Sequence, residues 1–178
     1  MKNILTTALA ILAAIVLTAF AVCIGSVNGW RGERDEALSF DSHNADLTAL
    51  VDTRAMDAAN LAVVAARHLP EDDKFLTILR DARDVILSGK ADMASVLHAD
   101  AAITDAAAQL ARSLPTLATV QAAPRDTVYI SMLTSTLTSG QSAASLFEGV
   151  ASNFNSRMQS SLTGRLAMLL GVNPLEIE

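Results

Sequence analysis

The chain has 178 residues and a formal net charge of −6, from 13 Lys and Arg against 19 Asp and Glu. The length predicts one domain, and the acidic balance argues against binding to DNA or RNA, whose phosphates would repel it. Hydrophobic residues make up 51% of the chain, and much of this excess lies in one segment near the amino terminus.

The run from Ile4 to Ile24 is almost wholly apolar. At about 1.5 Å of rise per residue, a helix of this length crosses the hydrocarbon core of a bilayer, about 30 Å thick. The sequence therefore predicts an uncleaved transmembrane anchor over residues 1–25 and one further domain over residues 26–178. The residues expected to face lipid are Ile4, Leu5, Ile11, Leu12, Ile15, Val16, Leu17, Phe20 and Ile24.

Two alternatives for this segment remain open. A signal peptide cleaved after Ala21 fits the small residues at that site, although the apolar run continues beyond it. Lipid attachment at Cys23 is less favoured because Phe20 and Val22 suit a lipobox poorly. Trp30 is expected at the membrane interface, and the basic residues on the two sides of the anchor do not determine its orientation.

Helical spacing of apolar residues continues through the rest of the chain. We expect helix over 35–40, a break or kink at 41–44, and then helices over 47–68, 71–89 and 92–113. Pro70 and Pro115 stop two of these helices, and acidic residues suit the start of the second. After a connection over 116–124, Asp126 is a good N-cap for a last helix. With no strand alternation, the sequence predicts an all-α protein, an antiparallel bundle of four long helices after the anchor.

The last helix is expected to run unbroken from Asp126 to about Leu170. Its apolar positions alternate spacings of three and four, as in a coiled coil, and form one seam. The seam comprises Ile130, Leu133, Leu137, Gly140, Ala144, Phe147, Ala151, Phe154 and Met158. Because only Glu148 and Arg157 are charged between Thr127 and Gly164, we expect this helix to depend on packing for its stability.

The end of this helix is apolar nearly all round. The residues concerned are Leu162, Leu166, Met168, Leu169, Leu170 and Val172. One interpretation is that they close the base of the bundle. The other is that Leu162, Leu166, Leu169 and Leu170 contact the membrane or a partner.

The chain offers little for catalysis or cofactor binding. The three histidines, His43, His68 and His98, lie in separate segments without metal-ligand spacing, so neither a metal nor another cofactor is predicted. Phosphate-binding loops and activated serines are also missing, so we do not expect an enzyme. Asp100 and Arg54 fall on helical seams, where burial would require pairing. A bundle end at which both side chains reach water is the favoured interpretation, and a buried pair is the alternative.

Several short motifs resemble the LemA family, in the order in which that family has them. Near the anchor these are Asn28 and Asp35-Glu36-Ala37-Leu38-Ser39, and in the middle Leu110, Leu114-Pro115 and Leu117-Ala118. In the last helix they are Phe147-Glu148, Phe154-Asn155, Ser161-Leu162, Gly171-Val172 and Pro174. The chain departs from the family pattern at His43-Asn44, Ser139-Gly140 and Ser160-Ser161. The resemblance implies a divergent member, a single-pass helical protein of the bacterial inner membrane.

These features favour a non-enzymatic, membrane-anchored scaffold that binds an unidentified protein partner or itself. The alternative is a lipid-binding, membrane-remodelling or stress-sensing protein that uses the anchor and the apolar tail. Either function has the lipid bilayer as a partner, and the side of the membrane on which the domain lies stays open.

Overall fold

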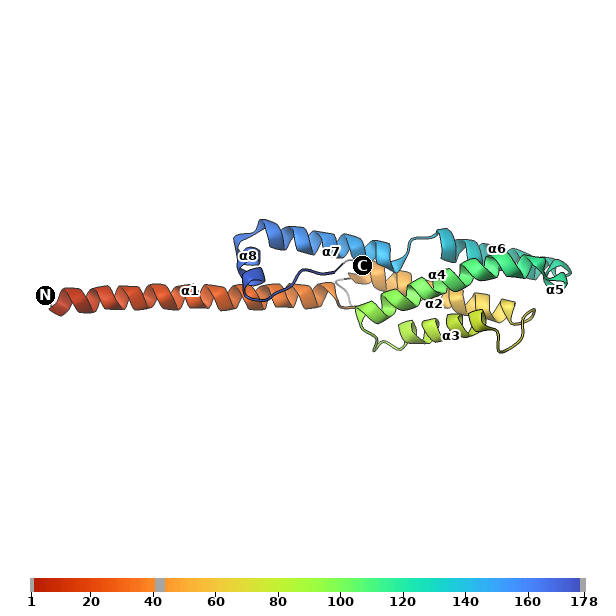
Figure 1. Ribbon diagram of the computed structural model, residues 1–178, viewed down its shortest axis with the longest axis horizontal. Coiled ribbons are helices and arrows are strands. Elements are labelled where there is room, and N and C mark those ends of the chain that lie inside the picture. The colour runs from red at the N-terminus through yellow and green to blue at the C-terminus, as the bar shows by residue number, and fades with distance from the viewer. Residues whose placement is uncertain (1, 41–43, 177–178) are drawn as a thin grey trace. The chain divides into compact units, whose positions relative to one another are not determined.

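The computed structural model describes residues 2–40 and 44–176, with side chains from residue 6 onward, and the regular structure in these ranges is helical (Figure 1). The helices are α1 (Lys2–Ala37), α2 (Ala45–Ala65), α3 (Lys74–Leu87), α4 (Met93–Ser113), α5 (Ala118–Gln121), α6 (Pro124–Ser139), α7 (Ala143–Ser160) and α8 (Leu162–Leu169), with a 3-10 helix, η2 (Leu114–Thr116). The predicted all-α class is thus confirmed. The expected break at 41–44 and His43 lie largely outside the described residues.

The chain divides into two compact units, residues 38–148 and residues 1–37 with 149–178. In the first unit α2 and α4 pack against each other, and α3 and α6 each pack against both of them. Their apolar seams meet in a core of fully buried side chains, which include Leu61, Leu76, Leu79, Ile103, Leu110, Leu114, Val120, Ile130 and Leu137. We attribute the stability of α6, which has few charged residues, to this packing.

Aspartates start two of these helices. Asp73 precedes α3 and accepts hydrogen bonds from the backbone N–H groups of Phe75, at 2.8 Å, and Leu76, at 3.3 Å. Asp92 precedes α4 and accepts one from the Ser95 N–H at 2.8 Å. Both are N-caps that satisfy donors left without intrahelical partners.

Asp126 has a different role from the one expected. The helix α6 begins at Pro124, whose fixed φ and missing N–H suit the first helical position, so the N-cap prediction for Asp126 is wrong. Its carboxylate instead lies 2.8 Å from Nη1 of Arg67 and 3.0 Å from Nε2 of His68. These contacts tie the start of α6 to the residues that follow α2.

The prediction of one unbroken helix from Asp126 to about Leu170 is wrong as well. The segment forms α6, α7 and α8, with breaks at 140–142 and at Ser161. Gly140 and Ala144, expected on the seam, are exposed. The three-and-four spacing holds inside each helix, but it cannot show whether the backbone between two matching stretches stays helical.

The second unit contains α1, the part of α7 from Gly149 onward, and α8, which packs against α1. After α8 the chain turns at Gly171, whose φ of +92° is one that side chains other than glycine rarely adopt. The amide of Asn155 then pairs with the backbone of Leu175: its Nδ2 donates to the carbonyl oxygen at 2.9 Å, and its Oδ1 accepts from the N–H at 2.8 Å. The side chains of Val172 and Leu175, in this C-terminal segment, are both buried.

Candidate functional sites: a buried ion pair and an exposed apolar helix

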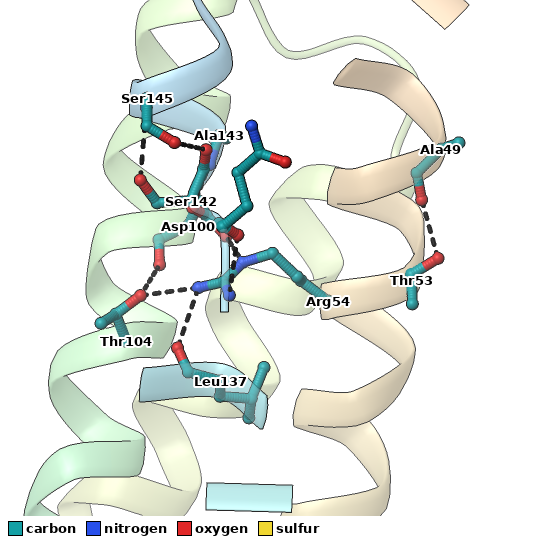
Figure 2. A network of polar contacts seen from close by, with 10 residues as sticks. Ala49, Thr53, Arg54, Asp100, Thr104, Leu137, Ser142, Ala143 and Ser145 are labelled. Carbon is teal, nitrogen blue, oxygen red and sulfur yellow. Dashed lines mark hydrogen bonds and ion pairs between the residues drawn. The ribbon is translucent and has the colours of Figure 1, made fainter. Parts of the chain in front are cut away.

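A buried ion pair joins α2 and α4. Nε of Arg54 donates to Oδ1 of Asp100, and the two side chains are 4% and 1% exposed. Figure 2 shows both pointing into the space between the helices. The expectation that they reach water at a bundle end is therefore wrong, and the buried pair is what the structure contains.

The pair lies at the break between α6 and α7. The Arg54 guanidinium donates to the carbonyl oxygens of Leu137, at 3.3 Å, and Gln141, at 3.4 Å. Oδ2 of Asp100 accepts from the Ala143 N–H at 2.9 Å. A cation thus meets the carbonyl end of one helix and an anion the N–H end of the next, which is the favourable order at helix ends.

Hydroxyl groups complete this network. Oγ1 of Thr104 accepts from Nη2 of Arg54 at 2.7 Å and donates to the carbonyl oxygen of Asp100 at 3.1 Å. Oγ of Ser142 accepts from the Ser145 N–H at 3.2 Å (Figure 2). Because the ion pair is closed to solvent and its groups are matched by partners, it can hold a helix break in place but has no access to a substrate.

The apolar half of α1 is the second feature. From Thr6 onward, α1 is long and apolar enough to cross a membrane, and none of its most apolar window is buried within the protein. The predicted lipid-facing residues from Ile11 to Ile24 are exposed, whereas the side chains of Ile4 and Leu5 lie outside the described part. The helix continues without interruption beyond residue 25, the predicted end of the anchor.

Ser26 and Trp30 are the buried residues of α1 among those whose side chains the structure describes. The indole Nε1 of Trp30 lies 3.3 Å from Oγ1 of Thr163, and the Trp30 ring packs edge-to-face on Phe154 with centroids 5.7 Å apart. Arg157 places its guanidinium carbon 5.9 Å from the Trp30 ring and donates to Glu33 at 2.8 Å. Trp30, which the sequence places at a membrane interface, therefore connects α1 to α7 and α8 within this unit.

The structure divides the predicted seam and tail residues between interior and surface. Those that are buried are Ile130, Leu133, Leu137, Phe147, Phe154 and Met158. In the tail, Leu162 and Leu169 are 85% and 84% exposed, Leu170 is exposed and Leu166 is half-buried. The buried positions of α8 are instead Gly164 and Ala167.

A groove of about 820 Å³ lies between α3 and α4, and its lining includes Ile78, Val85, His98 and Ala102. Among the described residues, no group of three or more His, Cys, Asp or Glu side chains is placed to hold a metal ion. His68 is engaged with Asp126, in another part of the unit.

Comparison with known proteins adds no assignment: no family model, no curated protein and no solved structure matches the chain.

Sequence reasoning missed the helix break that Arg54 and Asp100 serve. Gly140 and Ser142 were the available signals, since glycine favours a helix end and serine a helix start. The half-exposed, half-buried character of α8 was also missed, because eight residues of mostly apolar sequence do not reveal which face has a partner.

Proposed function

We propose that this chain is a non-enzymatic, single-pass membrane protein whose helical part acts as an interaction module for another protein chain, identical or different. The motif resemblance to the LemA family supports a protein of that general type, in the bacterial inner membrane. The anchoring half of the proposal is supported by the exposed apolar surface of α1, which in water would be a large unburied patch.

We also infer that α2, α3, α4 and α6 form an antiparallel four-helix bundle. The packing of α3 and of α6 on both α2 and α4, and the short connections along the chain, support this arrangement. Such a bundle offers its outer helix faces to partners without any need for a cavity or a reactive group.

The observation that carries the interaction proposal is the outer face of α6. Val128, Tyr129 and Met132, which share one side of the helix, are 67%, 54% and 53% exposed. No charged side chain occurs between Asp126 and Glu148, so this face lacks the charged residues that are typical of a solvent-exposed surface. Uncharged surfaces with aromatic and methionine side chains are typical of protein interfaces.

The test is site-specific photocrosslinking of the full chain in native membranes. A photoreactive phenylalanine replacing Tyr129 should give crosslinks to protein, identified by mass spectrometry as a second copy or another chain. The matched control places the same group at Gln109, an exposed position of α4. Recovery of monomer alone from both positions would refute the interaction proposal.

A second set of variants tests the same face through its charge. Val128→Lys and Met132→Lys add charge at exposed positions and should abolish the Tyr129 crosslinks without unfolding the protein. Ala101→Lys, at an exposed site of α4, should leave the crosslinks unchanged. Equal crosslinking in all three variants would show that the α6 face is not the interface.

A further inference from the structure

The short helix α8 is built with its small residues inward and its large apolar residues outward. Gly164 and Ala167 are buried, whereas Leu162 and Leu169 are almost fully exposed and Leu166 is partly so. At 100° per residue these three leucines share one side of the helix. A leucine face that remains open on a packed helix indicates a missing apolar neighbour.

The position of α8 identifies that neighbour. The helix packs against α1, and the indole N–H of Trp30 donates to Oγ1 of Thr163. Trp30 is six residues beyond Ile24, the end of the apolar run, which is about 9 Å along a helix axis. Figure 1 shows α8 running from the end of α7 to α1. The leucine face therefore lies at the depth where α1 leaves a bilayer.

The turn before α8 is fixed rather than loose. Oγ of Ser161 accepts from the Gly164 N–H at 2.9 Å and caps α8. Gly164 lies so close to the backbone of Met158 that an added Cβ would be 2.7 Å from the Met158 Cα. This contact holds α8 against the end of α7 and keeps the leucines on the outside.

Three arginines of the same unit lie near the ends of α1 and α8 in the sequence. Arg31 and Arg34 line a pocket of about 330 Å³ together with Asp35, Gly171, Val172 and Asn173. Nε of Arg34 is buried and has no hydrogen-bond partner among the described residues. Arg165, on the flank of the leucine face, uses its Nε on the carbonyl oxygen of Gln159 and is otherwise exposed. Arginines just outside an apolar surface suit the phosphates of lipid headgroups.

We propose that α8 is a membrane-interface helix: Leu162, Leu166 and Leu169 enter the outer acyl region of the bilayer that α1 crosses, with Arg31 and Arg34 beside the lipid phosphates. The occupant of the leucine face is thus a phospholipid surface. The inference rests on the membrane anchoring proposed above and goes beyond it, because it makes the α1–α8 pair a two-point attachment that fixes how α1 is held at the interface.

The experiment uses the full chain with Cys23→Ser, reconstituted as single copies in lipid nanodiscs of zwitterionic and anionic phospholipid. Leu169→Cys is labelled with an environment-sensitive fluorophore, and lipids brominated near the headgroup serve as quenchers. Ser152→Cys, at an exposed site of α7 about 13 Å along the axis from Ser161, is the matched control. We expect a blue-shifted emission and at least about twofold stronger quenching at residue 169 than at residue 152.

Trp30, the one tryptophan of the chain, reports the anchor separately in unlabelled protein. Quenching of Trp30 by the same lipids together with quenching at residue 169 would support the inference. Quenching of Trp30 with a water-exposed label at residue 169 would overturn it and leave the anchoring intact. No quenching of Trp30 would overturn the anchoring proposal itself. A label that is shielded but unquenched by lipid would show that protein covers the leucines, which also refutes the inference.

Discussion

Removing one member of the Arg54–Asp100 pair should be the most damaging polar substitution in the residue 38–148 unit. Asp100→Leu leaves the Arg54 guanidinium buried without a counter-ion and the Ala143 N–H without its acceptor. Breaking a buried pair in this way typically costs about 3–5 kcal/mol of unfolding free energy. Since a domain has only about 5–15 kcal/mol in total, we expect a large loss of stability.

The double variant Arg54→Met/Asp100→Leu separates the two contributions to this loss. It removes both charges and leaves side chains that can pack in an apolar interior, so the cost of an unpaired charge disappears. What remains is the loss of the bonds to Thr104, Leu137, Gln141 and Ala143, together about 2–3 kcal/mol. The double variant should therefore be more stable than either single variant, with a coupling energy of at least about 3 kcal/mol.

The assay is denaturant unfolding of the full chain in detergent micelles, together with hydrogen exchange read by mass spectrometry. Peptides that cover residues 137–143 should exchange faster in Asp100→Leu, because the helix ends lose their caps. Asp100→Asn, which keeps an acceptor for the Ala143 N–H, should protect this segment better than Asp100→Leu. It also keeps the test available if the leucine variant does not fold.

The matched control is the Arg83–Asp84 pair, whose side chains are 33% and 65% exposed. An exposed pair of the same residue types contributes about 0–1 kcal/mol, so Arg83→Met and Asp84→Leu should change stability little. If Asp100→Leu costs no more than Asp84→Leu, or if the two single losses simply add in the double variant, the capping explanation is wrong.

Three further predictions concern other parts of the chain. Gly164→Ala should destabilise the protein by about 1–3 kcal/mol, because the added methyl meets the backbone of the preceding turn. Gly149→Ala, with open space around it in α7, should instead stabilise the protein by about 0.5–1 kcal/mol. Equal effects of the two substitutions in thermal unfolding would contradict this prediction. The pKa of Asp92 lies below its ordinary value because the Ser95 side chain and then its backbone N–H bond the carboxylate. The folded state therefore binds a proton at Asp92 less readily than the unfolded chain does. The resulting stabilisation is present above about pH 4 and is lost as the pH falls through the lowered pKa. Asp92→Asn should remove this part of the pH dependence of stability, and an NMR titration that gives the Asp92 carboxyl a pKa at or above the ordinary value would refute the prediction. Trp30→Ala should cost about 3 kcal/mol, and hydrogen exchange should show α8 released first, whereas uniform destabilisation of both units would count against its role as the anchor of α8.

Two of the helices that could be predicted from the sequence begin at a capping side chain beside the helix. The helix expected over 92–113 is observed as Met93–Ser113, after the Asp92 cap, and the one expected over 71–89 as Lys74–Leu87, after the Asp73 cap. Capping side chains act within three residues of their own position. Local sequence therefore contains the information that sets these boundaries.

The break between α6 and α7 could not be predicted in the same way, because its strongest caps come from Arg54 and Asp100, which are distant in the chain. The continuous three-and-four spacing across residues 130–158 was misleading for a related reason. Leu137 and Phe147, on the two sides of the break, are both buried. A break that leaves each helix with an apolar side can preserve the three-and-four spacing of apolar residues across it. Gly140 and Ala144, the two positions where the count meets the break, are exposed.

The charge-poor character of residues 127–147 explains why the caps come from elsewhere. A helix break exposes carbonyl oxygens on one side and N–H groups on the other, and each needs a partner when buried. The threonines and serines of α6, such as Thr134 and Thr138, donate to carbonyl oxygens of their own helix instead. Only Ser142 caps locally, so α2 and α4 supply the charged groups. The buried side chains of Arg54 and Asp100 therefore bond the backbone groups at the break, while the outer face of α6 has no charged side chain beyond Asp126. The interior cap therefore fits the proposal that the uncharged outer face of α6 contacts another chain.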